Sequence, residues 1–147
     1  MLLNLLTGLA VMVACLVLQA IFVTICLRHY VRIKSGWQDR PSQLQIMTLL
    51  AIVMVLMLMA NFFQTAVWAV LFMRLREFAE FEAALYYSGV TFATLGYGDL
   101  LLSERWRLLG PLEAANGILM FGVSTAVMTA AVMDVIKQLQ AKPRIDE

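Results

Sequence analysis

The sequence contains 147 residues, of which 62% are hydrophobic and 14% are charged. Soluble domains are close to half apolar and one-quarter charged, so this composition argues against a soluble domain and predicts an integral membrane protein. The formal net charge of +1 gives no indication of a nucleic-acid partner. The apolar segments lack the alternation typical of a membrane β-barrel, so we expect an all-α membrane protein.

Three uncharged runs are long enough to cross a bilayer as helices, at residues 2–27, 44–73 and 114–133. A fourth uncharged run, at 83–98, is shorter than a span and rich in glycine, which disfavours a simple helix. Re-entrant segments fall in this length class, and non-helical backbone at membrane depth must line a cavity or be buried in protein. We therefore predict three transmembrane helices and one re-entrant segment.

The first run lacks the basic start of a signal peptide and a small-residue cleavage site, so we expect a retained helix. The polar linker after it contains the helix breakers Gly36 and Pro41. We assign 1–43 to this helix and its linker. A short tail at 137–147 ends the chain.

Basic residues indicate the orientation of these segments. The segment between positions 74 and 113 contains four Lys and Arg residues. The linker and tail contain seven: Arg28, Arg32, Lys34, Arg40, Lys137, Lys142 and Arg144. The positive-inside rule places the basic segments in the cytoplasm. We therefore expect a multi-pass protein with its N-terminus outside and its C-terminus in the cytoplasm, in what the small architecture suggests is a prokaryotic inner membrane.

The second and third runs enclose the predicted pore domain, residues 44–136. We divide it into an outer helix at 44–75, a pore helix and filter at 80–99, and an inner helix at 111–136. In the outer helix, we expect Asn61, Gln64 and Thr65 to form hydrogen bonds between helices rather than to take part in transport.

The re-entrant segment contains the residues that are best suited to bind an ion. Phe81 to Phe92 suits a short helix that ends before Thr94-Leu95-Gly96-Tyr97-Gly98. Glycines at alternate positions permit backbone angles that other residues avoid, so that successive carbonyls can turn to one side. Such carbonyls replace the water around a cation, and the negative end of the short helix favours a cation at the membrane centre. The segment therefore predicts a cation path.

The third run begins after Gly110, with Pro111 in the first helical turn, where a missing N–H is tolerated. Glu113 then falls in that turn, where its carboxylate favours the positive end of the helix dipole; a pore-related role is the alternative. One helical stripe of this run is a candidate cavity-lining face, and packing between helices is the alternative role for it. The stripe consists of Ile118, Gly122, Thr125 and Thr129. Gly117 or Gly122 is a hinge candidate, and Met128 a candidate for an apolar gate.

The run from Thr91 to Asp99 resembles the pore loop of the tetrameric potassium channel family, whose filter reads Thr-Val-Gly-Tyr-Gly. The nine-residue pattern T-x-x-T-L-G-Y-G-D matches, with Leu95 in the usual valine place. The chain resembles a small bacterial-type member with one extra N-terminal helix. The resemblance implies that the carbonyls of Thr94, Leu95, Gly96 and Tyr97, with the Thr94 hydroxyl, coordinate K⁺. Gly98 and Asp99 form the outer mouth.

The sequence departs from the family pattern next to the filter. Tyr86 and Tyr87 stand where the family often has two tryptophans, so the filter support has a different reach. Val90 stands where some members have a glutamate that pairs with the mouth aspartate. We therefore expect Asp99 to lack that partner.

These observations predict a homotetramer in a lipid bilayer, because one chain supplies one filter strand and a ring of carbonyls needs four. The predicted function is passive conduction of K⁺, with no cofactor other than the permeant ion and no nucleic-acid partner. The sequence contains no His/Cys metal set or Ser/His pair in the spans, so we do not expect an enzyme. The alternatives are a weakly selective cation channel and a non-conducting subunit that regulates a larger transporter.

Overall fold

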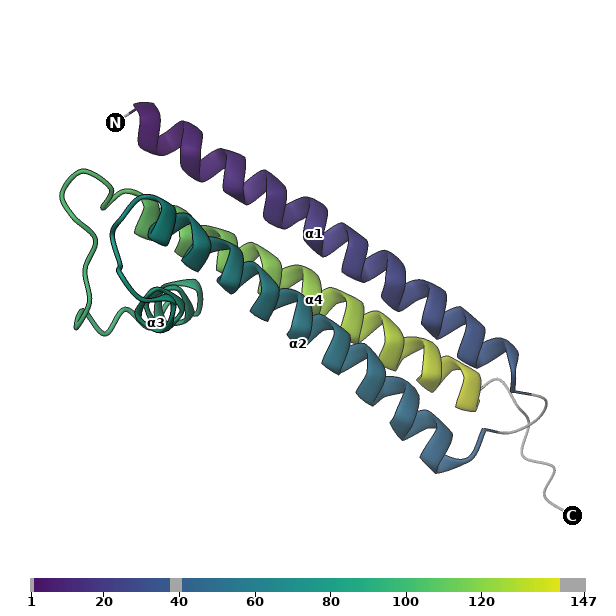
Figure 1. Cartoon of the computed structure of the whole chain (residues 1–147). Coiled ribbons are helices and arrows are strands. Elements are labelled where there is room, and N and C mark those ends of the chain that lie inside the picture. Colours follow the sequence, from purple (N-terminus) through teal and green to yellow (C-terminus); the bar gives the residue numbers. More distant parts are fainter. Residues whose placement is uncertain (1, 38–40, 141–147) are drawn as a thin grey trace, which may run out of the picture.

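The computed structural model describes residues 2–37 and 41–140, which form four helices. They are α1 (Leu2–Ser35), α2 (Gln43–Arg74), α3 (Phe81–Phe92) and α4 (Leu109–Gln140). Three of them are long and apolar enough to cross a membrane, and the short α3 lies at one end of the bundle (Figure 1). This arrangement confirms the all-α fold with three candidate membrane helices, and the short α3 is consistent with the expected pore helix. Arg40, Lys142 and Arg144 lie outside the described residues, as does most of the expected tail.

The connection between α1 and α2 is shorter than the expected polar linker. The first helix continues to Ser35, and its last turn contains Arg32 and Lys34, whose charges are favourable at the negative end of a helix. A capping box begins α2: the Ser42 hydroxyl accepts a hydrogen bond from the Gln45 N–H at 3.2 Å, and the Gln45 side-chain oxygen accepts one from the Ser42 N–H at 2.8 Å. Local capping chemistry therefore sets this boundary.

The inner helix, α4, begins at Leu109, two residues earlier than expected. The turn before it is already hydrogen-bonded, with the Leu109 N–H donating to the Trp106 carbonyl at 2.9 Å. Pro111 still fits the first turn, because the first four N–H groups of a helix have no partner within it. Glu113 lies beyond that turn and is fully buried. The expectation that Glu113 serves the helix dipole is therefore wrong.

A polar layer joins the three long helices in the middle of the bundle. Asn61 on α2 donates to the Ser124 hydroxyl on α4 at 3.0 Å, and Gln64 on α2 donates to the Gln19 side chain on α1 at 2.7 Å. Gln19 in turn donates to Ser124 at 3.2 Å. The expected interhelical bonds are confirmed for Asn61 and Gln64. The expectation is wrong for Thr65, whose hydroxyl bonds the Asn61 carbonyl within α2.

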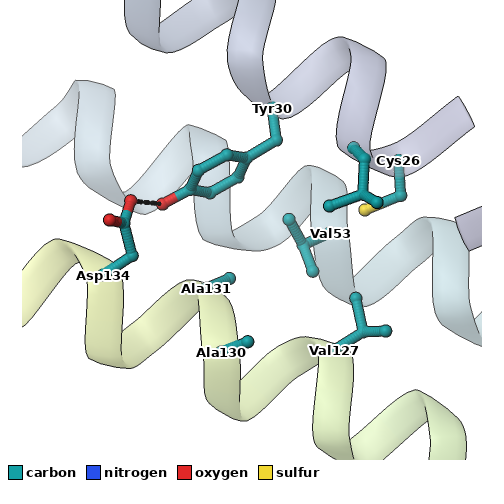
Figure 2. Close-up of a pocket in the computed structure, with 8 residues that line it drawn as sticks. Cys26, Tyr30, Val53, Val127, Ala130, Ala131 and Asp134 are labelled. Carbon is teal, nitrogen blue, oxygen red and sulfur yellow. Dashed lines mark hydrogen bonds between the residues drawn. The ribbon is translucent and has the colours of Figure 1, made fainter. Parts of the chain in front are cut away.

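A second set of contacts joins α1 to α4 at the end of the bundle away from α3. The Tyr30 hydroxyl donates to the Asp134 carboxylate at 2.5 Å, and Lys34 forms an ion pair with the same group. Figure 2 shows the Tyr30–Asp134 bond at the edge of a pocket of about 170 Å³ between α1, α2 and α4. Cys26, Val53, Val127 and Ala131 line its apolar part.

The other end of α1 lies beside the loop that precedes α4. The Asn4 side chain donates to the Arg105 carbonyl at 2.6 Å. The start of α1 therefore lies at the same end of the bundle as α3, whereas the α1–α2 connection and the end of α4 lie at the other (Figure 1). The first helix packs against both α2 and α4 along the bundle.

Candidate functional site

The short helix α3 packs between the ends of α2 and α4. Gly117 on α4 lies directly against the last turn of α3: a Cβ placed there would collide with the Phe92 carbonyl group. One turn further along α4, the Phe121 ring meets the Phe92 ring edge-on, with centroids 5.5 Å apart. Gly117, a predicted hinge, therefore has a packing role, because only glycine permits this close approach of the two helices.

The backbone leaves the helical path immediately after α3. The N–H of Thr94 donates to the Thr91 carbonyl at 2.9 Å, and the N–H of Leu95 donates to the Val90 carbonyl at 2.9 Å. Positive φ angles follow at Thr94 (60°), Gly96 (58°) and Gly98 (77°). The alternate glycines had been expected to adopt such angles. Thr94 is the exception, because a β-branched residue at positive φ is strained and must be held there by its surroundings.

The carbonyl groups of the filter segment are free within the subunit. Among the described residues, no backbone N–H donates to a carbonyl between Thr94 and Gly98. The side chains here are open as well: Leu95 is 57% and Tyr97 is 66% exposed. Buried or membrane-embedded carbonyls require partners, so this segment needs a ligand, water or further protein around it.

Asp99 has a partner that the sequence did not predict. The Tyr86 hydroxyl, thirteen residues earlier, donates to its carboxylate at 2.7 Å. This hydrogen bond lowers the pKa of Asp99 below its ordinary value and raises the pKa of Tyr86. The prediction concerned a glutamate partner only, and Tyr86 of α3 is a partner of a different kind that the sequence did not reveal.

Tyr87 has a different role from its neighbour. Its ring packs edge-on against Phe72 of α2, with centroids 5.3 Å apart, and beside Phe78 at 5.2 Å. Tyr87 and Val90 also line a pocket of about 130 Å³ between α3 and the outer part of the filter segment. The two tyrosines therefore make different contacts: Tyr86 bonds Asp99, whereas Tyr87 packs α3 against α2.

One face of α4 is open within the subunit. The predicted stripe of Ile118, Gly122, Thr125 and Thr129 is exposed at all four positions. The Ile118 side chain is 62% exposed. No described residue covers this face, and both its cavity-lining role and the alternative of packing between helices stay predictions. Met128 lies off this face and is half-buried against a core that includes Met57 and Cys26. Its role as a gate residue stays a prediction.

Four polar residues with defined positions were not singled out from the sequence: Gln19, Ser88, Asn116 and Ser124. All four are buried. The sequence pattern that could have identified them is the one that identified Asn61 and Gln64, namely a polar side chain within an apolar run. At membrane depth such a side chain needs a partner inside the protein, which makes it a candidate for a structural or functional contact.

The comparison with known families agrees with this geometry. A family described as ion channel matches residues 47–134, from the start of α2 to the last turns of α4. The match covers more than half of the chain, and the protein belongs to this ion channel family rather than to a class of enzymes. Among curated proteins and solved structures, none matches the chain significantly.

Proposed function

We propose that four copies of this chain form a channel that conducts K⁺ passively through the segment Thr94–Gly98. The observation that carries the proposal is the row of carbonyls without backbone partners at the end of α3. A dehydrated cation needs such oxygens, and the positive φ angles at Gly96 and Gly98 give the backbone the alternation that a carbonyl-lined path requires.

The exposed surfaces support assembly around an axis. The open face of α4 and the exposed filter side chains lie on parts of the subunit that no described residue covers. In a homotetramer these surfaces face the axis and the neighbouring subunits. Thr125 and Thr129 then offer hydroxyls to a hydrated ion below the filter, and Gly122 is the hinge candidate that has no packing contact within 4 Å of an added Cβ.

The Tyr86–Asp99 hydrogen bond favours potassium selectivity over a weakly selective pore. It joins the middle of α3 to Asp99, the residue directly after the filter segment, so the outer end of that segment is tied to α3 within one chain. We also propose that the filter faces the outside of the cell. The basic end of α1, with Arg32 and Lys34, lies at the opposite end of the bundle, where the positive-inside rule favours the cytoplasm.

Flux into liposomes tests the proposal directly. Purified protein is reconstituted, and uptake of K⁺ and of Na⁺ is measured separately in the wild type and in Gly96→Ala. We expect K⁺ uptake well above Na⁺ uptake. We expect its loss in the variant, because alanine at positive φ costs about 1–2 kcal/mol and disturbs the carbonyl alternation.

Gly36→Ala is the matched control, since the same change is made in the α1–α2 connection, outside the pore. Its uptake should equal that of the wild type. Equal K⁺ and Na⁺ uptake by the wild type would indicate a weakly selective channel. No uptake from correctly assembled protein would indicate a non-conducting subunit.

A further inference from the structure

A cluster of buried polar side chains lies behind the pore helix. Ser88 projects from α3, and Glu113 and Asn116 project from the first turns of α4; all three are fully buried. Ser88 faces the Glu113 carboxyl, and Cys15 of α1 adjoins Asn116. The cluster therefore lies where the pore helix, the inner helix and the first helix meet.

The polar atoms of this cluster lie outside hydrogen-bond distance and angle of every described residue, although Ser88 lies beside the Glu113 carboxyl and Cys15 beside Asn116. Both carboxyl oxygens of Glu113, both amide atoms of Asn116 and the hydroxyl of Ser88 are buried and unpaired. Within residues 2–37 and 41–140, no cationic side chain pairs with the carboxyl group either. The ion pair found in the described part of the chain joins Lys34 to Asp134, at the other end of the bundle.

This environment determines the chemical state of Glu113. A buried carboxylate without a cation or donors carries a desolvation cost of several kcal/mol, so the group is held as the neutral acid. The neutral acid has one O–H to donate and retains acceptor capacity. Leaving a buried polar atom unpaired is costly, and proteins meet this need with internal water that hydrogen-bonds to such groups.

We propose that Glu113, as a neutral carboxylic acid, binds ordered water together with Ser88 and Asn116, and that this hydrated site fixes the pore helix against the inner helix. Glu113 is thus a positioning residue for the filter: it acts through Ser88, two turns of α3 before Thr94. The effect on conduction rests on the proposed function. The hydrated site itself does not, and it can be measured in protein that conducts nothing.

The first test is infrared spectroscopy of the assembled protein in detergent at about pH 7, where exposed carboxyl groups are ionised. We expect a carbonyl stretching band of a protonated carboxylic acid that Glu113→Gln removes. Glu104→Gln, the same change at an exposed position, should leave the band intact. Ser88→Ala should shift the band, because one hydrogen-bonding partner of the site is lost. Absence of the band, or no shift in Ser88→Ala, would overturn the proposed site.

The second test measures selectivity in liposomes. Glu113→Gln keeps a donor and an acceptor without charge, so the ratio of K⁺ to Na⁺ uptake should stay within about twofold of the wild type. Glu113→Leu keeps the volume but removes the hydrogen bonds, and we expect the ratio to fall about fivefold, the factor that corresponds to about 1 kcal/mol. Equal ratios in the two variants would refute the positioning role. If Glu113→Leu does not assemble, the comparison is made with Ser88→Ala.

The pH profile separates positioning from simple packing. Raising the pH until Glu113 loses its proton should place a charge behind the pore helix and reduce K⁺ uptake in the wild type, but not in Glu113→Gln. The other titratable groups facing this region are Cys15 on α1, and Tyr87 on α3 with Glu77 beside it; α2 contributes Trp68 and Phe72, which do not ionise. These groups are present in both proteins, so a shared profile would overturn the neutral-acid assignment.

Discussion

Replacing Gly117 with alanine adds one methyl group at the point where α4 crosses the last turn of α3. The new Cβ would lie 2.9 Å from the Phe92 carbonyl carbon and 3.2 Å from its Cα, and closer still to the carbonyl oxygen. These are backbone atoms, which cannot rotate away as a flexible side chain can. The two helices must therefore separate, and the end of α3 carries the filter segment with it.

The size of the effect follows from two opposing contributions. Overpacking a tight contact costs about 1–3 kcal/mol. Alanine is favoured over glycine inside a helix by about 1 kcal/mol, which offsets part of that cost. Gly122→Ala is the matched control for stability, because it gains the same helix propensity while its Cβ meets nothing within 4 Å. The difference between the two variants therefore isolates the clash, and we expect Gly117→Ala to be less stable by about 1–3 kcal/mol.

The assay is unfolding in detergent, with the free energy of unfolding compared between the two variants, followed by K⁺ uptake for Gly117→Ala. We expect reduced uptake in that variant, because the displaced pore helix moves the filter. Equal free energies of unfolding in Gly117→Ala and Gly122→Ala, with normal uptake in the former, would refute the close contact between α4 and α3. Gly117 would then remain a candidate hinge with no packing role.

Three further predictions concern the contacts that brace the bundle. Tyr86→Phe removes the hydrogen bond that lowers the pKa of Asp99, so the pKa rises and the carboxylate is protonated at a higher pH. Acid inhibition of K⁺ uptake should therefore begin at a higher external pH. An unchanged midpoint of this inhibition would contradict the role of Tyr86. Gln64→Leu should lower the free energy of unfolding by about 0.6–1.7 kcal/mol, more than an equivalent change at a lipid-facing position of α2. Neutralising either Lys34 or Asp134 should lower the free energy of unfolding by less than about 1 kcal/mol, because both side chains are partly exposed. A larger decrease would show that this ion pair is better shielded from water than its exposure indicates.

The three long apolar helices and the positive φ angles at Gly96 and Gly98 were predictable because their signals are local. Bilayer thickness demands long apolar runs, and the alternate glycines at 96 and 98 need no tertiary information to be read as special backbone. The polar residues Asn61 and Gln64 were predictable in kind, since a polar group at membrane depth needs a partner. Their actual partners, Gln19 and Ser124, depend on how three helices meet.

The positions that the sequence did not reveal have a common cause in tertiary contacts. Asp99 finds its partner thirteen residues earlier, at Tyr86, because the chain turns back along α3 after the filter. Glu113 looked like a residue serving its own helix end, but the helix begins earlier and α3 covers that side of it. Met128 is half-buried against a core that includes Cys26 of α1, a helix that the family resemblance does not describe. A local pattern could not have revealed any of these three positions.

The reversal potential of the purified protein in a planar bilayer tests the central claim most directly. With K⁺ on one side and an equal concentration of Na⁺ on the other, a K⁺-selective filter at Thr94–Gly98 predicts a large potential of the sign set by K⁺ flow, and Gly96→Ala should reduce it. A reversal potential near zero in the wild type, with clear single-channel currents, would contradict the claim of potassium selectivity.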